Sequence, residues 1–171
     1  MTGQTAENPA ATLLARLGAA CWSLGAAESL TGGLLADRIV QVPGASATFR
    51  GSVVSYATDV KRDLLGVDAG LLAAHGPVHP LVAAQMATGA AQLLGTELTL
   101  ATTGVAGPAG QDGQGVGTIY LACAHPGGVW VRHYRLAGGR EQLRASSVDL
   151  ALALGAAAIR PTGNKQDAPG R

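Results

Sequence analysis

Two short segments of the chain hold the polar side chains best suited to acyl chemistry. Ser29 lies within residues 27–33, and Tyr56 and Lys61 lie within residues 55–61. A serine hydroxyl attacks a carbonyl carbon when a neighbouring base takes its proton, and a lysine becomes such a base when burial disfavours its charged form. These three residues therefore predict a serine nucleophile with a lysine and tyrosine relay for its proton.

The same residues have structural roles open to them. Ser29 or Thr31 could simply cap a helix, which is the commonest use of hydroxyl side chains at helix starts. Lys61 could stand in solvent and Tyr56 could pack in the core. Both interpretations stay open at the level of these residues alone.

Ser29 stands where an extended segment is expected to turn into a helix. Ala26 and Ala27 are typical of a short strand, and residues 32–40 have a helical pattern. The first N–H groups of a helix have no partner within it, and the helix dipole favours negative charge there. The neighbouring backbone could therefore hold the oxygen of a carbonyl that Ser29 attacks.

A glycine-rich loop over residues 104–117 lacks the Gly-Lys-Ser/Thr ending of a phosphate-binding P-loop. Its glycines can let backbone N–H groups approach a phosphate, and a long flexible connection is the alternative. Arg140 and Arg144 lie one turn apart at the start of the last expected helix. They could hold a phosphate together, or form a solvated face with Glu141.

Histidine and cysteine indicate no metal centre and no disulfide. His75 and His79 have the helical metal-binding offset, but Gly76 and Pro77 between them oppose a helix, so we expect no metal. Nothing indicates a Ser-His-Asp triad. The only two cysteines form no CxxC pair, which fits a reduced intracellular compartment, and both are expected to be buried, inert thiols: Cys21 and Cys123.

Composition fits one globular domain, with a small anionic ligand still possible. The chain has 171 residues, of which 47% are hydrophobic, and its formal net charge is +1. That charge gives no reason to expect nucleic acid or an anionic membrane as a partner. Residues 1–10 lack the features of a signal peptide and no apolar run is long enough to span a bilayer, so we expect a soluble, cytoplasmic protein.

Strands alternate with helices along the chain, which predicts an α/β sandwich. Adjacent strands near its end favour a mixed over a purely parallel sheet. We expect residues 1–160 to form a single domain and residues 161–171 to be a disordered tail. Helices are expected at residues 11–24, 32–40, 61–65, 68–74, 80–94 and 139–159, and strands at 26–27, 49–56, 98–103, 118–123 and 129–136.

Four motifs occur in order over residues 13–159. They are Ala27-Glu28-Ser29-Leu30-Thr31-Gly32-Gly33; residues 51–61 followed by Leu64-Leu65-Gly66-Val67 and His75-Gly76; Thr103-Gly104-Val105-Ala106-Gly107-Pro108 with Val116-Gly117-Thr118; and Gly139-Arg140 to Arg144. In this order they make the chain resemble the CinA C-terminal domain family, whose characterised stand-alone members are nicotinamide-nucleotide amidases.

The resemblance implies a fold and an activity. The fold is a three-layer α/β/α sandwich with a mixed sheet, commonly a homodimer, which needs no metal or other cofactor. The activity is hydrolysis of the carboxamide of nicotinamide mononucleotide to nicotinic acid mononucleotide and ammonia, in pyridine-nucleotide salvage. Ser29 would be the nucleophile, Lys61 the general base and Tyr56 its proton-shuttling partner.

The resemblance also implies a set of substrate contacts. Thr31, Gly32 and Gly33 would donate N–H groups at a helix terminus to the oxyanion, and residues 103–107 would line the nucleotide pocket. The residues expected to contact the small-molecule nucleotide are Glu28, Thr31, Gly32, Gly33, Thr103, Gly104, Ala106, Gly107 and Arg140.

The chain departs from the family pattern at two places. His79 and Pro80 stand where the family usually carries a Ser/Thr-type cap and an acidic residue, which changes local capping without touching the nucleophile. Ala109 replaces a frequent glycine in the loop that would contact the nucleotide. No fused N-terminal domain is recognised, so we expect the stand-alone form.

Two other functions stay open. A non-catalytic nucleotide-binding accessory protein of competence or DNA damage is the main alternative, because the family also occurs fused in competence-associated proteins. An amidase for another small carboxamide is the second.

Overall fold

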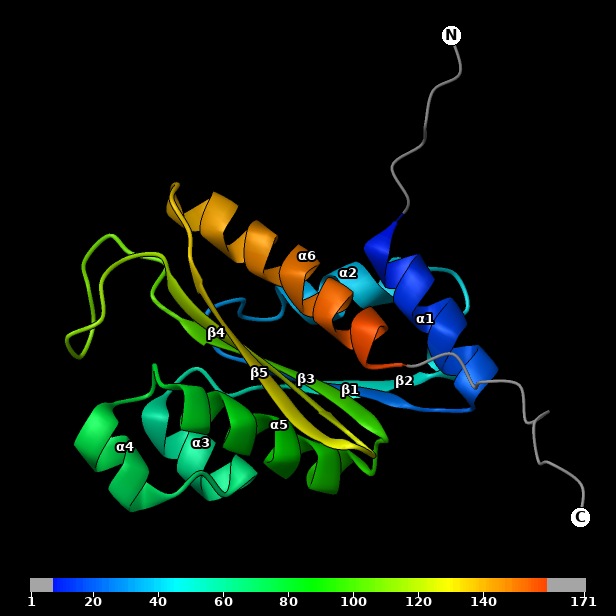
Figure 1. Ribbon diagram of the computed structural model, residues 1–171, viewed down its shortest axis with the longest axis horizontal. Helices are drawn as coiled ribbons and strands as arrows, with labels where there is room; N and C mark the ends of the chain where they lie inside the picture. Colours follow the sequence, from blue (N-terminus) through cyan, green and yellow to red (C-terminus); the bar gives the residue numbers. More distant parts are fainter. Residues whose placement is uncertain (1–7, 160–171) are drawn as a thin grey trace, which may run out of the picture.

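A computed structural model describes residues 8–159 of the chain as helices on both sides of one sheet (Figure 1). The tail expected at residues 161–171 lies outside the described residues. The helices are α1 (Pro9–Ala20), α2 (Leu34–Val40), the short 3-10 helix η1 (Ala45–Ala47), α3 (Thr58–Leu65), α4 (Ala69–His75), α5 (Pro80–Leu94) and α6 (Arg140–Ala158). The strands are β1 (Leu24–Glu28), β2 (Phe49–Val54), β3 (Leu98–Gly104), β4 (Thr118–His125) and β5 (Gly128–Arg135).

The sheet has five strands in the order β2-β1-β3-β4-β5. Strand β1 runs parallel to both β2 and β3, whereas β4 is antiparallel to β3 and β5 is antiparallel to β4. Glu28 at the end of β1 pairs in register with Val54 of β2 and Thr102 of β3. The mixed sheet is therefore confirmed, and three parallel strands end side by side at one edge.

Helices cover both faces of this sheet, which confirms the three-layer α/β/α sandwich. Figure 1 shows α1, α2 and α6 over one face and α3, α4 and α5 over the other. Two apolar cores match these faces: Ala26 and Leu100 belong to the core beneath α1, α2 and α6, and Ala27 and Ala101 belong to the core beneath α3 and α5. Successive strand residues point to opposite faces, so a central strand buried on both sides carries apolar residues toward both cores.

The helix before the candidate nucleophile ends earlier than the sequence pattern predicts. Cys21 adopts a left-handed conformation and its N–H bonds back to Leu17 and Gly18, so α1 stops at Ala20. This leaves room for β1 to begin at Leu24. Cys21 is exposed, which corrects the expectation that both thiols are buried.

The other thiol behaves as expected. Cys123 is buried in β4, and burial raises the pKa of its thiol to about 12. A thiol with so high a pKa stays protonated near neutral pH and is a poor nucleophile.

Close packing of α3 against α5 places Lys61. A Cβ atom on Gly89 of α5 would collide with the carbonyl oxygen of Leu65, the last residue of α3. The missing side chain therefore lets the two helices approach closely. As a result Lys61, on the first turns of α3, faces the interior and is only 1% exposed.

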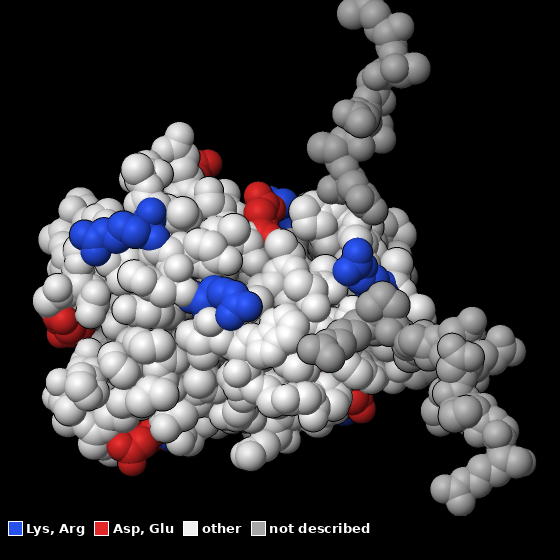
Figure 2. Space-filling view, in the orientation of Figure 1, with Lys and Arg blue, Asp and Glu red and all other residues white. Residues whose placement is uncertain are grey.

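Surface charge is sparse on the face seen in Figure 2, where a few Lys, Arg, Asp and Glu side chains, some with opposite charges side by side, lie in a largely uncharged surface. On that face the coloured residues form no continuous positive stripe. Within residues 8–159, no helix combines the length and the apolar character needed to cross a bilayer.

Candidate active site

A polar cavity lies at the edge where the three parallel strands end. Ser29 follows β1, Ser55 and Tyr56 follow β2, and Thr103 and Gly104 end β3. In α/β sheets, ligands bind in the crevice outside the carboxyl ends of such strands. The cavity has a volume of about 160 Å³ and is lined by Ser29, Leu30, Tyr56, Lys61, Pro77, Val78, Thr103, Gly104, Val105, Ala106, Gly107, Ala109, Gln111 and Arg140.

The structure brings most of the expected residues to this cavity and leaves four outside it. The lining includes all three residues expected to be catalytic, Ser29, Tyr56 and Lys61. It also includes five of the expected substrate contacts: Thr103, Gly104, Ala106, Gly107 and Arg140. The four that do not line it are Glu28, Thr31, Gly32 and Gly33.

Lys61 is buried with its amine held by backbone carbonyls. Its Nζ donates to the carbonyl oxygen of Ser55 at 2.6 Å and to that of Tyr56 at 3.2 Å. Burial lowers the pKa of Lys61 from 10.5 to about 8, because the charged form loses its hydration. The alternative of a solvent-exposed lysine is therefore wrong.

The amine geometry suits a general base. A neutral amine has two N–H bonds and one lone pair, and the two carbonyls accept the two N–H bonds. The lone pair is then the position left for a proton from the cavity, which Lys61 and Ser29 both line. Within residues 8–159, Ser29 Oγ has no hydrogen-bond partner and no bond yet joins it to Lys61 Nζ; such contacts are often long before substrate binds.

Tyr56 contacts Lys61 through its backbone rather than its phenol. The side chain is 60% exposed, and its hydroxyl accepts a hydrogen bond from Arg140 Nη2 at 3.0 Å. Arg140 Nη1 also donates to the carbonyl oxygen of Gly107 at 2.8 Å. The expected direct relay between the phenol and Lys61 is therefore not formed in this structure, and the alternative of a core tyrosine is wrong as well. Tyr56, Arg140 and Gly107 are joined along the cavity lining.

Glu28 caps α2 and does not line the cavity, so the structure gives it a capping role in place of the expected position at the substrate. Its fully buried carboxylate accepts N–H bonds from Gly33 at 2.9 Å, from Leu35 at 3.0 Å and from Ala36 at 3.0 Å. Ser52 Oγ donates a fourth bond at 2.9 Å. The carboxylate thus takes the Gly33 N–H that was expected to serve an oxyanion, together with two N–H groups of α2, because a negative group at a helix N-terminus is stabilised by both hydrogen bonds and the dipole.

The expected oxyanion donors are therefore wrong at two positions. The Gly33 N–H is bound to Glu28, and the Gly32 N–H donates to the carbonyl oxygen of Ser29 at 3.1 Å. Both glycines have positive φ, so α2 starts only at Leu34. Among the described residues, the buried N–H groups left without an acceptor in this turn are those of Leu30 and Thr31.

Neither hydroxyl caps α2, so the capping alternative is also wrong. Thr31 Oγ1 bonds to Thr102 Oγ1 at 2.8 Å inside the protein. The N-cap residue of α2 is Gly33, which has no side chain to offer. This leaves the Ser29 hydroxyl unoccupied at the cavity.

Arg144 neither lines the cavity beside Arg140 nor stands free in a solvated face. Its Nε donates to the carbonyl oxygen of Leu30 at 3.1 Å and its Nη2 to that of Thr31 at 2.6 Å. The guanidinium is therefore bound to the turn that follows Ser29. Sequence patterns could not reveal these partners, because backbone carbonyls leave no signature of their own in a sequence.

Two further residues connect the cavity with the segment that leads into α5: Thr103, which lines the cavity, and His79, which lies next to it in that segment. Thr103 Oγ1 donates to the carbonyl oxygen of Pro77 at 2.8 Å. His79 caps α5, since its Nδ1 accepts from the Leu81 N–H at 3.3 Å, and its ring stacks on His75 with centroids 4.5 Å apart. His79 thus supplies the cap in place of the hydroxyl residue usual in the family.

Fold and site together define a class: a three-layer α/β domain with a serine and a buried lysine at the carboxyl ends of its parallel strands. A sequence profile of the CinA C-terminal domain matches residues 6–159. The chain belongs to the CinA C-terminal domain family.

Relatives in sequence carry the same family name. A CinA-like protein of Frankia casuarinae is 54% identical over 132 residues, which is 77% of this chain and 30% of that protein. A CinA-like protein of Geobacter sulfurreducens is 48% identical over 131 residues, 76% of this chain and 32% of that protein. The chain thus spans about a third of the length of these relatives.

Solved structures share the fold. The CinA superfamily protein of Klebsiella pneumoniae has a TM-score of 0.86 and 31% identity, over 91% of this chain and 98% of that one. The competence/damage inducible protein CihA of Agrobacterium tumefaciens has a TM-score of 0.85 and 30% identity, over 93% of this chain and all 100% of that one.

Proposed function

We propose that the protein is an amidohydrolase that converts nicotinamide mononucleotide to nicotinic acid mononucleotide and ammonia. One observation carries the proposal: Ser29 and Lys61 line the same cavity, and burial lowers the pKa of Lys61 to about 8. A lysine with that pKa has a minor but available neutral fraction near physiological pH, whereas an ordinary lysine has almost none, and the neutral amine can take a proton from serine.

The first step is acylation of Ser29. Lys61 Nζ takes the hydroxyl proton while Ser29 Oγ bonds to the carboxamide carbon, and the carbonyl oxygen becomes an oxyanion. The Leu30 N–H, free of other acceptors and next to the nucleophile, is the nearest candidate donor to that oxyanion. One preorganised donor of this kind is worth about 3 kcal/mol in the transition state.

The second step releases ammonia and then the acid. Lys61 returns its proton to the amide nitrogen, the C–N bond breaks and ammonia leaves. Water then attacks the ester on Ser29, Lys61 takes the water proton, and the carboxylic acid departs as Ser29 regains a proton. Lys61 can perform each transfer because its two carbonyl contacts hold the amine in place. A role for the Tyr56 phenol in this relay is a separate hypothesis, which requires it to leave Arg140.

The size and charge of the cavity fit a nucleotide bound by one end. A volume of about 160 Å³ is room for a pyridine carboxamide rather than for a whole nucleotide. The ribose phosphate would then lie at the mouth, where Arg140 is the exposed cation of the lining. Arginine suits this task because its planar guanidinium binds phosphate through two N–H groups.

Ammonia release from nicotinamide mononucleotide by the purified protein tests the proposal. Ser29→Ala is expected to abolish release above background, whereas Ser46→Ala, at an exposed position on η1, is the matched control and should keep the wild-type rate. Absence of turnover in the wild type, or undiminished turnover in Ser29→Ala, would refute the proposal.

A non-catalytic nucleotide-binding role is the second candidate, favoured by the competence/damage inducible name of the Agrobacterium tumefaciens protein. It predicts saturable binding of the nucleotide, measured by calorimetry, without ammonia release. Turnover of other carboxamides but not of the nucleotide would instead identify an amidase of different specificity.

The assembly and location of the protein are also proposals. We propose a cytoplasmic homodimer that binds no nucleic acid. Light scattering at two protein concentrations tests the dimer, and a gel-shift experiment with DNA and RNA tests the absence of nucleic-acid binding.

A further inference from the structure

Arg144 joins helix α6 to the turn that presents the candidate nucleophile. The residue is half-buried on α6, and its guanidinium donates to two successive carbonyl oxygens, of Leu30 at 3.1 Å and of Thr31 at 2.6 Å. These partners are 114 and 113 residues away in the chain. Both belong to the turn between β1 and α2 that follows Ser29 directly.

Holding a carbonyl oxygen also aims an N–H group. In a trans peptide unit, C=O and N–H point in opposite directions within one rigid plane. Arg144 at the Leu30 oxygen therefore fixes where the Thr31 N–H points. Arg144 at the Thr31 oxygen fixes the Gly32 N–H in the same way.

The Gly32 N–H carries this constraint one peptide further. It donates to the carbonyl oxygen of Ser29 at 3.1 Å, which fixes the plane of the Ser29–Leu30 peptide unit and so the direction of the Leu30 N–H. Leu30 and Thr31 are 4% and 0% exposed, and their N–H groups have no acceptor among residues 8–159. Buried N–H groups without acceptors are rare, because each one left unmet destabilises the fold.

We propose that Arg144 is a positioning residue: it fixes the turn after Ser29 so that the free N–H group of Leu30, which lines the cavity, points at the oxyanion formed on Ser29. This inference rests on the proposed function and names Arg144 as the residue that positions the oxyanion donor. A guanidinium suits the task because its rigid fork can hold two oxygens at once. Its charge also polarises the Thr31–Gly32 peptide unit, whose N–H bonds the Ser29 oxygen, and this chain of hydrogen bonds strengthens the Leu30 N–H as a donor.

Glu28 holds the other end of the same turn. Its carboxylate accepts the N–H groups of Gly33, Leu35 and Ala36, so the turn is fixed to α2 on one side and to Arg144 on the other. Because these N–H groups already donate to Glu28, they are not available to an oxyanion on Ser29. Of the two free N–H groups between these anchors, that of Leu30 belongs to a residue that lines the cavity.

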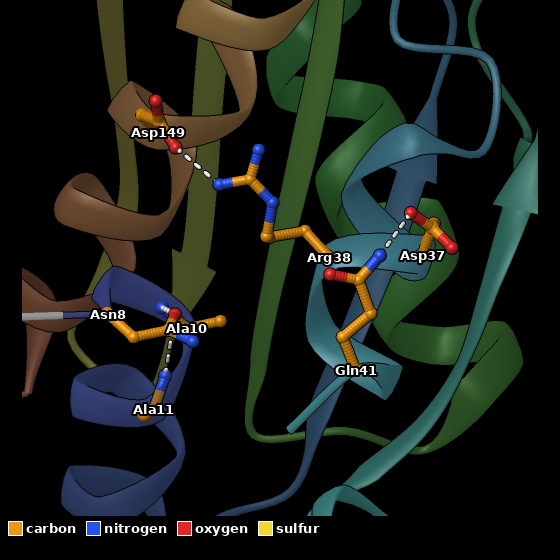
Figure 3. Close-up of polar contacts among 7 residues, drawn as sticks. All are labelled: Asn8, Ala10, Ala11, Asp37, Arg38, Gln41 and Asp149. Atoms are coloured by element: carbon orange, nitrogen blue, oxygen red, sulfur yellow. Dashed lines mark hydrogen bonds and ion pairs between the residues drawn. The ribbon is translucent and has the colours of Figure 1, made fainter.

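The experiment compares Arg144→Ala and Arg144→Lys with a matched control, Arg38→Ala. Arg38 of α2 forms an ion pair with Asp149 of α6 at 3.0 Å (Figure 3), so it also links α2 to α6 but does not contact the turn. Ammonia release gives kcat and KM for nicotinamide mononucleotide. Intact mass spectrometry gives the rate at which a fluorophosphonate labels Ser29, with formation of the O–P bond, loss of fluoride and transfer of the hydroxyl proton to Lys61.

The labelling rate keeps the inference distinct from the proposed substrate. The phosphoryl oxygen of the probe needs the same donors as an oxyanion but no nucleotide specificity. A wild type that labels at Ser29 without releasing ammonia would refute the proposed substrate, and the variants would still test Arg144. A wild type that does not label at Ser29 would overturn the inference.

Arg144→Ala is expected to lower both kcat and the labelling rate about 100-fold, the effect of losing an oxyanion donor, with KM within about threefold of wild type. Arg144→Lys can hold only one carbonyl, so its kcat and labelling rate should lie between those of wild type and Arg144→Ala. Both rates of Arg38→Ala should stay within about twofold of wild type. Wild-type rates in Arg144→Ala, or an equal loss in Arg38→Ala, would overturn the inference. If Arg144→Ala does not fold, Arg144→Lys decides: a folded variant with a reduced labelling rate supports the inference and one with the wild-type rate overturns it.

Discussion

Lys61 Nζ lies 2.6 Å from the carbonyl oxygen of Ser55, so the buried amine at the candidate active site is held by the backbone. Among the described residues, no carboxylate forms an ion pair with it. A carboxylate would stabilise the charged amine and raise its pKa, whereas burial lowers the pKa of Lys61 to about 8. Because backbone carbonyls rather than a carboxylate contact the amine, its pKa stays near enough to physiological pH for some of it to be neutral.

The pH dependence of turnover follows from this pKa. Because only the neutral amine accepts a proton, kcat/KM is expected to rise with pH up to about 8 and to level off above it. Steady-state rates from about pH 6 to about pH 9.5 measure the curve. A profile that is flat across this window would assign the base to another group.

Loss of the amine should abolish efficient catalysis without unfolding the protein. Lys61→Ala is expected to lower kcat at least about 100-fold, the contribution of a general base. Circular dichroism and the thermal midpoint should show a folded variant, because Lys61 lies at the cavity lining and burial of its amine is itself unfavourable. Near-normal turnover in a folded Lys61→Ala would give the base role to Tyr56 or to water.

Stability should also change with pH through Lys61. The pKa is lowered to about 8 in the folded protein and is 10.5 for an ordinary lysine, so between these values the unfolded chain binds more protons than the folded one. The free energy of unfolding therefore gains a positive slope with pH in this window. Urea titrations should show wild type gaining stability relative to Lys61→Met from about pH 8 to about pH 10. A constant difference between the two proteins would contradict the lowered pKa.

Replacement of the buried carboxylate should loosen α2 and the turn before it. Glu28→Gln keeps one oxygen but places an NH₂ group among N–H donors, so we expect a loss of about 2 kcal/mol of unfolding free energy and a lower kcat. Glu97→Gln is the matched control: this carboxylate is exposed and accepts two bonds from Ser23, so its loss should be smaller. Urea denaturation measures both. Equal losses of unfolding free energy in the two variants would show that the Glu28 cap stabilises the protein no more than an exposed carboxylate does.

The Tyr56 hydroxyl should matter for binding more than for proton transfer. It contacts Arg140 instead of Lys61, so Tyr56→Phe is expected to raise KM and to lower kcat by less than about tenfold. Separate measurement of kcat and KM distinguishes the two roles. A fall in kcat of about 100-fold at unchanged KM would restore the relay through the phenol.

Local patterns were sufficient for most of the elements and for the identity of the reactive groups. The pattern over residues 80–94 predicts α5 with the bounds that the structure shows, since proline at its start and glycine after its end are read directly from neighbours in the chain. The segment around Ser29 and the pair Tyr56 and Lys61 were recognisable because their residue types alone limit the chemistry. Alternation of strands and helices likewise predicted the α/β class.

Only the tertiary structure decided which groups those residues contact. Arg144 meets the Leu30 carbonyl across 114 residues and Arg140 meets the Tyr56 hydroxyl across 84, and nothing local in the chain encodes either partner. Burial of Lys61 depends on how closely α3 packs on α5. The capping role of Glu28 is not readable from the sequence, because a carboxylate beside a serine is as consistent with substrate binding as with capping. Composition and periodicity report propensities of neighbouring residues, whereas hydrogen bonds and desolvation depend on chain segments that meet only after folding.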